Sequence, residues 1–221
     1  MNVDESISKY DHPYVTVDGV LFRFDPDCGL CVKLCQPVGS DQWRLPGGFM
    51  PVDRLAVDVL REKVLEKAGE EGFYAEQLQT YDALDRDGRG RIVSIAYLCL
   101  CPPVSSTSRQ RTASGYEAVW IPADEVLADG GLAFDHTDII RDARTRLANK
   151  LWYSDLARYL LPDEFRLSWI QGMYELLEEK EYYTNFKRNM GDRIVATGAI
   201  EGGAPGRKAA LYKWNDGWKG D

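Results

Sequence analysis

The sequence lacks the long apolar run that a membrane-spanning helix needs, which is about 20 consecutive residues. Its 221 residues also lack an overall basic excess, because the formal net charge is −8. A chain coated with basic patches is therefore excluded, although a local basic patch is not. The first residues, MNVDESISKYDHP, are acidic and polar and do not resemble a secretion signal. We therefore expect a cytoplasmic protein with no membrane association.

Histidine is scarce and cysteine occurs in an odd number, so metal and disulfide frameworks have little support. The histidines are His12 and His136, and the cysteines are Cys28, Cys31, Cys35, Cys99 and Cys101. Cys28 and Cys31 form a Cys-x-x-Cys pair, but a zinc site needs a fourth ligand, and neither histidine is near in sequence. We predict reduced thiols that act as small buried hydrophobic side chains, with zinc or redox chemistry as the alternative.

Hydrophobic residues make up 44% of the chain, which is enough for a buried core. Stretches rich in β-branched and aromatic residues predict strands at 14–24, 30–36, 74–83, 92–101 and 116–121. Residues 54–68 have helical spacing, and Gly69 ends this helix after an apolar face formed by Leu55, Val59, Leu60 and Val64. A helical turn at 122–127 and a largely helical segment over 134–160 follow. This order predicts an α/β (α+β) sandwich over residues 1–149.

The pattern changes after Pro162, and we predict a second unit over residues 150–221. An amphipathic helix spans 165–180, with Ser168 as a candidate N-cap and an inward face formed by Leu167, Ile170, Tyr174 and Leu177. A short helix over 183–190 follows, and then a hairpin whose strands include 193–196 and 209–214. Helix, helix and hairpin is the layout of a winged helix.

The second unit carries a local basic excess, because residues 183–213 contain six basic residues against two acidic ones. Phosphate contacts require such an excess. Phe186 and Met190 are expected to face the core, which leaves outward side chains that read base edges or grip phosphates. The predicted DNA-contacting residues are Tyr183, Thr184, Asn185, Lys187, Arg188, Arg207 and Lys208. The alternative is a basic hairpin that is merely solvated.

Residues 43–69 resemble a Nudix box. The box reads Gly, five residues, Glu, seven residues, Arg-Glu, an aliphatic residue, any residue, Glu-Glu, any residue, Gly. In functional members the helix glutamates hold Mg²⁺, which activates water and neutralises a diphosphate. This chain matches at Gly48, Val64, Glu66 and Gly69, and departs from the box at Arg54, Glu62, Lys63 and Lys67.

Lysine therefore stands at two of the three metal positions on the helix. Two ammonium groups reverse the local field that a dication needs, so we expect weak Mg²⁺ binding, no catalysis and no required cofactor. If the Arg-Glu pair is displaced by one residue to Arg61-Glu62, then Glu62 and Glu66 share a helical face and are the remaining candidate metal pair. The alternative is a solvated charged face in which these glutamates pair with lysines.

Further motifs resemble the Nudix-related transcriptional regulators along nearly the whole chain. Residues 85–97, DRDGRGRIVSIAY, resemble the segment DRDxRGRxxSxAY. LAFDH at 132–136 resembles the start of their linker helix, and LPDEF at 161–165 resembles the start of their winged helix. YTNFKRNM at 183–190 resembles their recognition helix, and GRKAALY at 206–212 resembles their wing, with Lys208 in place of proline.

This resemblance implies a Nudix-like α/β/α sandwich that binds an effector, followed by a winged helix-turn-helix that binds operator DNA as a homodimer. In the family the effector is ADP-ribose or a related nucleotide in one branch and a sugar such as arabinose in another. Arginine side chains can bind phosphates or hydroxyls, and aromatic rings can stack on a ring of the ligand. The candidate effector residues are therefore Trp43, Arg44, Phe49, Tyr81, Arg86, Arg89 and Arg91. Structural pairing of these arginines with Asp53, Asp85 and Asp87 is the alternative.

We therefore predict a DNA-binding transcriptional regulator, a repressor or an activator, whose inactive Nudix-like domain senses a small molecule. The alternative is a Nudix hydrolase that cleaves ADP-ribose or a related nucleoside diphosphate with Mg²⁺ at a non-standard site, and Lys63 and Lys67 weigh against it. A third possibility is a metabolite-binding protein whose winged helix makes protein contacts only. The basic excess near the end of the chain weighs against that possibility.

Overall fold

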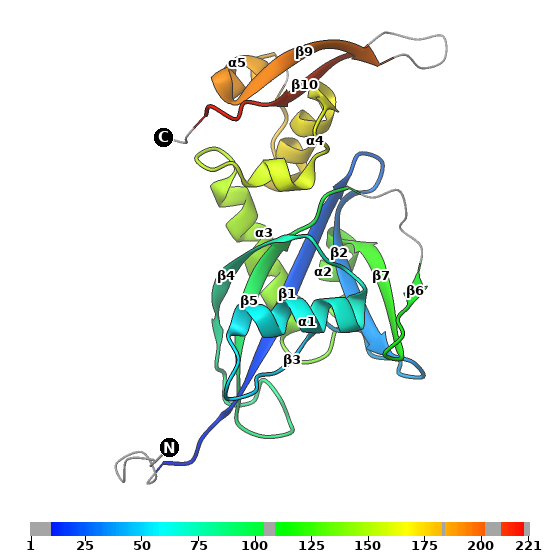
Figure 1. The fold of residues 1–221 in the computed structure, drawn as a ribbon, viewed down its shortest axis with the longest axis vertical. Coiled ribbons are helices and arrows are strands. Elements are labelled where there is room, and N and C mark those ends of the chain that lie inside the picture. Colours follow the sequence, from blue (N-terminus) through cyan, green and yellow to red (C-terminus); the bar gives the residue numbers. More distant parts are fainter. Residues whose placement is uncertain (1–9, 104–108, 183, 202–208, 219–221) are drawn as a thin grey trace.

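The computed structural model describes residues 10–103, 109–182, 184–201 and 209–218. Three of the predicted DNA contacts, Tyr183, Arg207 and Lys208, lie outside these ranges. Figure 1 shows a larger unit that contains the N-terminal half of the chain and a smaller unit that contains the C-terminal strands. Within the described ranges, no helix combines the length and the apolar character that a bilayer crossing needs.

The larger unit is built on one mixed sheet with the strand order β4-β5-β1-β2-β7-β6, and β3 pairs with the free part of β1. β1 and β5 run parallel, from Tyr14 opposite Ile92 to Phe22 opposite Leu100, and the other strand pairs of this sheet are antiparallel. The strands are β1 (Tyr14–Asp25), β2 (Gly29–Pro37), β3 (Gly47–Phe49), β4 (Tyr74–Tyr81), β5 (Ile92–Leu100), β6 (Gln110–Arg111) and β7 (Tyr116–Pro122).

Helices cover both faces of this sheet. On one face α1 (Ala56–Ala68) packs Val59, Leu60 and Val64 into a cluster with strand residues such as Leu21 and Cys35. On the other face, α2 (Ala123–Asp129) and α3 (His136–Lys150) pack against a cluster that continues into the smaller unit. The predicted α/β/α sandwich is therefore confirmed.

The predicted start of the first helix was wrong. Leu55 was expected on the apolar face of the first helix, but it precedes that helix and is 70% exposed. The segment over 134–160 is largely helical, as predicted, because α3 ends at Lys150 and a 3₁₀ turn, η1 (Leu156–Leu160), follows after a break. The break is stabilised because the backbone N–H and hydroxyl of Ser154 both donate to the Lys150 carbonyl, at 3.1 and 2.6 Å. Gly69 does end α1, with a left-handed φ of 67°.

The smaller unit has the predicted order of helix, helix and hairpin. It comprises β8 (Phe165–Arg166), α4 (Leu167–Glu178), α5 (Phe186–Met190), η2 (Gly191–Arg193), β9 (Ile194–Glu201) and β10 (Ala209–Trp214). The strands form a sheet in the order β8-β10-β9, and β9 and β10 make the hairpin. The predicted N-cap Ser168 was wrong, because α4 begins after Arg166, where Phe165 and Arg166 pair with β10.

The thiols are mostly buried, as predicted. Cys31, Cys35, Cys99 and Cys101 are buried and Cys28 is exposed. Burial raises the pKa of Cys31 to about 11 and that of Cys35 to about 12, so these thiols stay protonated near neutral pH. Among the described residues, no cluster of three or more His, Cys, Asp or Glu side chains has the proximity that a metal site needs.

Candidate functional site

A cavity of about 100 Å³ lies where β3 pairs with β1, next to the first turn of α3. Its walls come from β1, β3, the last turn of α1, the loop at 82–91 and the start of α3. The lining residues are Thr16, Asp18, Arg44, Leu45, Gly47, Gly48, Phe49, Lys67, Asp87, Arg89, Phe134 and His136. Ligand pockets commonly measure roughly 300–1,000 Å³, so this cavity encloses only part of a nucleotide-sized molecule.

The Gly-Gly pair of the Nudix-like box brings β3 close to β1. The strands predicted from the sequence do not include this segment, but Gly47 and Gly48 lie opposite Asp18 and Val17 in an antiparallel ladder. A methyl group at Gly47 would overlap the Val17 carbonyl oxygen and the Asp18 carboxylate. Glycine is therefore required for the backbone to form this wall of the cavity.

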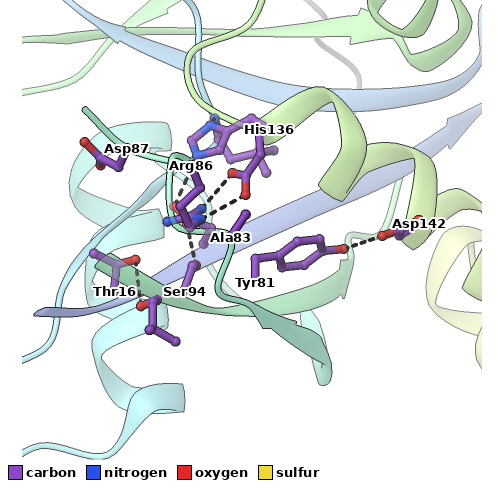
Figure 2. Close-up of polar contacts among 12 residues, drawn as sticks. Thr16, Tyr81, Ala83, Arg86, Asp87, Ser94, His136 and Asp142 are labelled. Atoms are coloured by element: carbon purple, nitrogen blue, oxygen red, sulfur yellow. Dashed lines mark hydrogen bonds and ion pairs between the residues drawn. The ribbon is translucent and has the colours of Figure 1, made fainter. Parts of the chain in front are cut away.

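A buried polar cluster adjoins the cavity and shares Asp18 and His136 with its lining. Figure 2 shows this cluster around Arg86, Ser94 and His136. Arg86 is 3% exposed at its side chain and donates to both carboxylate oxygens of Asp135, with Nε–Oδ2 at 2.9 Å and Nη2–Oδ1 at 2.7 Å. The Ser94 hydroxyl donates to Asp18 Oδ2 at 2.5 Å, and Arg86 Nη2 lies 3.7 Å from the same oxygen. The cluster therefore joins β1, β5, the 82–91 loop and the start of α3.

His136 joins this cluster from the first position of α3. Its Nδ1 accepts the Leu45 backbone N–H at 2.9 Å, so Nε2 carries the proton of the neutral ring and points toward Asp18, 3.7 Å away. Burial lowers the pKa of His136 below its ordinary value, and Arg86 and Arg44 lower it further, against the opposing effect of Asp18 and Asp135. His136 is therefore neutral and acts as a structural link between α3 and the segment before β3.

Three cations line the cavity, and they differ in how their charge is balanced. Arg89 forms an ion pair with Asp87, with Nη2–Oδ2 at 2.6 Å, while its guanidinium lies 5.3 Å from the Phe49 ring centre. Arg44 lies 5.8 Å from the ring centre of Phe134. Within the described residues, neither Arg44 nor Lys67 has a carboxylate within ion-pair distance, so positive charge exceeds what Asp87 balances.

Lys63 and Lys67, the two lysines of the Nudix-like box on α1, have different neighbours. Lys63 Nζ lies 2.6 Å from Glu66 Oε2 and 3.2 Å from Glu62 Oε1, and Arg54 also pairs with Glu62 at 3.0 Å. Hydrogen bonds to these glutamates raise the pKa of Lys63 and hold it charged. The candidate metal pair, Glu62 and Glu66, is therefore engaged by cations, as the charged-face alternative predicted. Lys67 instead lines the cavity.

The seven predicted effector residues separate into two groups. Arg44, Phe49 and Arg89 line the cavity. Trp43 lines a different cavity of about 240 Å³, and Arg86 lies in the buried polar cluster. The Tyr81 hydroxyl donates to Asp142 at 2.8 Å, and Arg91 donates to the Asp82 and Ala83 carbonyls.

Sequence reasoning missed several lining residues, among them Asp18, Phe134 and His136. An aspartate inside the apolar strand at 14–24 was an available signal, because an unpaired buried carboxylate is costly and therefore needs partners. Phe134 adopts a left-handed φ of 58°, which is uncommon for a bulky residue and places its ring beside Arg44 and Arg89. No local pattern predicts that backbone conformation.

The second candidate surface is the exposed side of α5. Phe186 and Met190 are buried in the core, as predicted, while Thr184, Asn185, Lys187 and Arg188 are exposed. Lys187 Nζ lies 5.0 Å from the ring centre of Tyr212 on β10, which places this cation beside the hairpin. Arg193 is one of the six basic residues counted over 183–213, but it is buried, and Nη1 donates to the Leu151 carbonyl at 2.9 Å.

Helix α3 connects the cavity to the core beneath α5. Phe134 and His136 at its start line the cavity, and the chain leaves its end at Leu151. The Leu151 carbonyl accepts the Tyr174 hydroxyl at 2.8 Å as well as Arg193. The next residue, Trp152, stacks edge-on against Tyr174 and Phe186, with ring centres 4.8 and 6.1 Å apart. Helix α3 therefore runs from the cavity to a segment that packs against the buried side of α5.

Comparison with known proteins identifies the family. No family model matches the chain. The ADPR responsive transcriptional repressor NtrR of Acinetobacter baylyi is 32% identical over 204 residues, which cover 88% of this chain and 77% of that protein. The chain belongs to the NrtR family of Nudix-related transcriptional regulators. The predicted resemblance is confirmed.

Structures of another NrtR family member agree over both units. Shewanella oneidensis NrtR complexed with a 27mer DNA matches with a TM-score of 0.74 at 31% identity, covering 91% of this chain and 93% of that one. Its Nudix domain complexed with ADP ribose matches with a TM-score of 0.55 at 33% identity, over 66% of this chain and 94% of that one. A more distant relative is the ADP-ribose pyrophosphatase of Methanocaldococcus jannaschii, 26% identical over 60% of this chain and 74% of that protein.

Proposed function

We propose that this NrtR family member binds operator DNA through a winged helix and that ADP-ribose, bound in the Nudix-like domain, changes its DNA affinity. In this proposal, residues 1–149 form the domain that binds the effector, and residues 150–221 form the domain that binds DNA. One observation carries the proposal. Helix α3 begins at the cation-lined cavity, and the chain just beyond its end packs against Phe186 on the buried side of α5. A family member with the same fold is known with each of these two ligands.

For DNA, the proposed contacts are Thr184, Asn185, Lys187 and Arg188 on and before α5, with Tyr183, Arg207 and Lys208 outside the described residues. The α5 side chains are exposed while Phe186 and Met190 hold the helix in the core, so the helix presents donors without exposing its apolar face. Asparagine and arginine or lysine read base edges in the major groove, and cations bind phosphates. One winged helix covers one half-site, so we propose a homodimer on a palindromic operator.

For the effector, the proposed contacts are those candidates that line the cavity: Arg44, Phe49 and Arg89. Arginine binds diphosphate oxygens through paired hydrogen bonds. Phe49 and Phe134 are 45% and 39% exposed at the cavity, so their rings are available to stack against a base or cover a sugar. A ligand with a diphosphate and flat ring fits this lining better than an uncharged pentose does.

The alternative remains an ADP-ribose hydrolase, because pyrophosphatases occur among the relatives. We propose that hydrolysis is lost, since Glu62 and Glu66 are held by Arg54 and Lys63 and a third carboxylate is replaced by Lys67. Mg²⁺ is therefore not a required cofactor under this proposal. Glu62→Gln and Glu66→Gln variants separate the two functions, because they would abolish a metal-dependent activity and leave repressor function intact.

The test measures DNA binding and hydrolysis on the same purified chain. Fluorescence anisotropy with DNA from upstream of its own gene, across salt concentrations, should give specific binding that ADP-ribose changes and pentoses do not. Incubation with ADP-ribose and Mg²⁺ should release no AMP. Rapid metal-dependent AMP release without affinity for any duplex would overturn the proposal in favour of the hydrolase.

A further inference from the structure

Lys67 occupies a position at which the Nudix box has a metal-binding glutamate, and it lines the cavity from the last turn of α1. Its ammonium group donates to the Gly47 carbonyl at 2.6 Å and lies 5.1 Å from the Tyr116 ring centre. Both partners are uncharged. A lysine ammonium has three donors, so two remain for a ligand after the bond to Gly47 is made.

The electrostatics of Lys67 differ from those of its neighbour in the box. Lys63 is balanced by Glu62 and Glu66, whereas Lys67 has no carboxylate within 4.0 Å among the residues that the structure describes. Arg44 is similar, because its buried Nε has no hydrogen-bond partner in the described part of the chain. Lys67 and Arg44 both act on the buried Cys35 thiol, where their charges oppose the rise in its pKa, so the two cations flank one region.

The residues at the box helix therefore do not fit a divalent cation. A carboxylate cradle attracts Mg²⁺, but here the cavity side of the helix presents an ammonium group and its remaining glutamates are paired with cations. A diphosphate needs a positive charge beside it, whether a metal ion or a side chain supplies that charge. The same position can supply that charge directly, without an ion between protein and ligand.

We propose that Lys67 takes the place of the divalent cation and binds the effector's diphosphate through its own ammonium group, so that effector binding needs no metal. This proposal rests on the proposed function and adds to it the residue whose positive charge binds the diphosphate. An ammonium group neutralises phosphate oxygens but has no coordination position from which to deliver an activated water. The substitution therefore retains recognition of the diphosphate and removes the means of cleaving it.

Calorimetric titration of the full chain with ADP-ribose tests this proposal, once in EDTA and once in Mg²⁺. The dissociation constant should agree within about twofold between the two buffers. Lys67→Met should weaken binding by roughly tenfold or more in both, the loss expected for one charge-assisted hydrogen bond of about 1.5–3 kcal/mol. Lys67→Arg should restore most of the affinity, which excludes a folding defect as the cause.

Lys63→Met is the matched control, because it removes the same charge from the same helix but outside the cavity lining. It should leave the dissociation constant within about twofold of the parent value. Inorganic pyrophosphate should compete with ADP-ribose in the parent and compete poorly in Lys67→Met. Lys67→Glu should abolish binding in EDTA and recover part of it in Mg²⁺, because a carboxylate again requires the ion.

Two results overturn the inference while leaving the proposed function intact. One is ADP-ribose binding by the parent that disappears in EDTA. The other is an equal loss in Lys63→Met and Lys67→Met. If the parent does not bind ADP-ribose in either buffer, the effector assigned under the proposed function fails as well, and an arabinose titration then tests the sugar branch.

Discussion

Arg86 and Asp135 form a two-pronged ion pair, with N–O distances of 2.9 and 2.7 Å, between the 82–91 loop and the residue that precedes α3. The sequence interpretation paired Arg86 with a ligand or with a neighbouring aspartate. The structure gives it a partner about 50 positions away and buries it in the polar cluster next to the cavity. Its position indicates that it holds the start of α3 against the sheet.

Arg86→Met should lower the free energy of unfolding by about 3 kcal/mol, because it leaves Asp135 and Asp18 partly buried without their guanidinium. Urea unfolding at neutral pH measures this loss. Arg141→Met is the control, since Arg141 is exposed and forms an ion pair only with Asp138 among the residues that the structure describes; its change should stay below about 1 kcal/mol. Equal unfolding midpoints for the two variants would show that the buried pair has no special stabilising role.

Stability should fall on acidification because of His136. Burial lowers the folded-state pKa of His136, so the unfolded chain binds a proton at this residue more readily than the folded chain does. The stability that the neutral His136 ring contributes is therefore fully present above the pKa of an unfolded-state histidine, about 6.5. This stability is lost as the pH falls below that value, by at most about 1.4 kcal/mol per pH unit. The charged groups that act on the ring are Asp18, Asp135, Arg86 and Arg44.

His136→Asn supplies the comparison, because an asparagine oxygen can accept the Leu45 N–H and does not titrate. Chemical unfolding at a series of pH values between about 7 and 5 should give a shallower decline for the variant than for the parent. Parallel declines would mean that His136 does not control the acid sensitivity.

Arg188→Ala should weaken operator binding by roughly tenfold without changing the unfolding midpoint, because Arg188 is exposed on α5 and supports no core contact among the described residues. If the contact is to phosphate, the salt dependence of binding should also decrease by about one ion. Arg141→Ala, an arginine removed from α3, should bind the operator as the parent does. Parent-like binding by Arg188→Ala would contradict the assignment of α5.

Arg193→Ala should behave in the opposite way, although it lies three residues beyond α5. Its guanidinium donates to the Leu151 carbonyl and stacks 4.3 Å from the Trp218 ring centre. Loss of a buried charged hydrogen bond and this stacking should lower the free energy of unfolding by about 2 kcal/mol or more. A stable variant with weak DNA binding would place Arg193 on the DNA surface instead.

Softening α3 should reduce the coupling between ADP-ribose and DNA. Thr145 and Asn149 are exposed on α3, away from the cavity lining and from α5. Glycine at both positions costs about 1 kcal/mol each relative to alanine and loosens the helix. The ratio of operator dissociation constants with and without ADP-ribose should move toward one, while each ligand alone binds within about twofold of the parent.

The Thr145→Ala, Asn149→Ala variant is the control for this experiment and should keep the parent ratio. Calorimetry and anisotropy supply the separate affinities. An unchanged ratio in the glycine variant would mean that the signal reaches α5 by a route other than a rigid α3.

Elements set by local chemistry were predictable from the sequence. The helix that ends at Gly69 and the burial of Phe186 and Met190 follow from spacing and from the conformational freedom of glycine. The β3 strand was missed because Gly47 and Gly48 have no strand propensity. Its ladder depends on a distant partner, β1, that spacing along the chain does not specify.

The cavity was predictable only in part for the same reason. Arg44, Phe49 and Arg89 are residue types that bind phosphates and rings, so their chemistry suggested them. Which arginine faces a ligand and which lies in the core depends on contacts such as Arg86 with Asp135 and Arg193 with Leu151. These contacts join residues far apart in sequence, and local patterns do not encode them.

The parallel ladder between β1 and β5 has a consequence for biosynthesis. β1 is made early, but its pairing from Tyr14 to Phe22 waits until Leu100 has left the ribosome, because parallel neighbours cannot form a local hairpin. During that interval one edge of a strand that the finished fold buries along most of its length stays open to other chains. The yield of soluble protein should therefore depend on how quickly translation passes residue 100 and on chaperones that shield nascent strands.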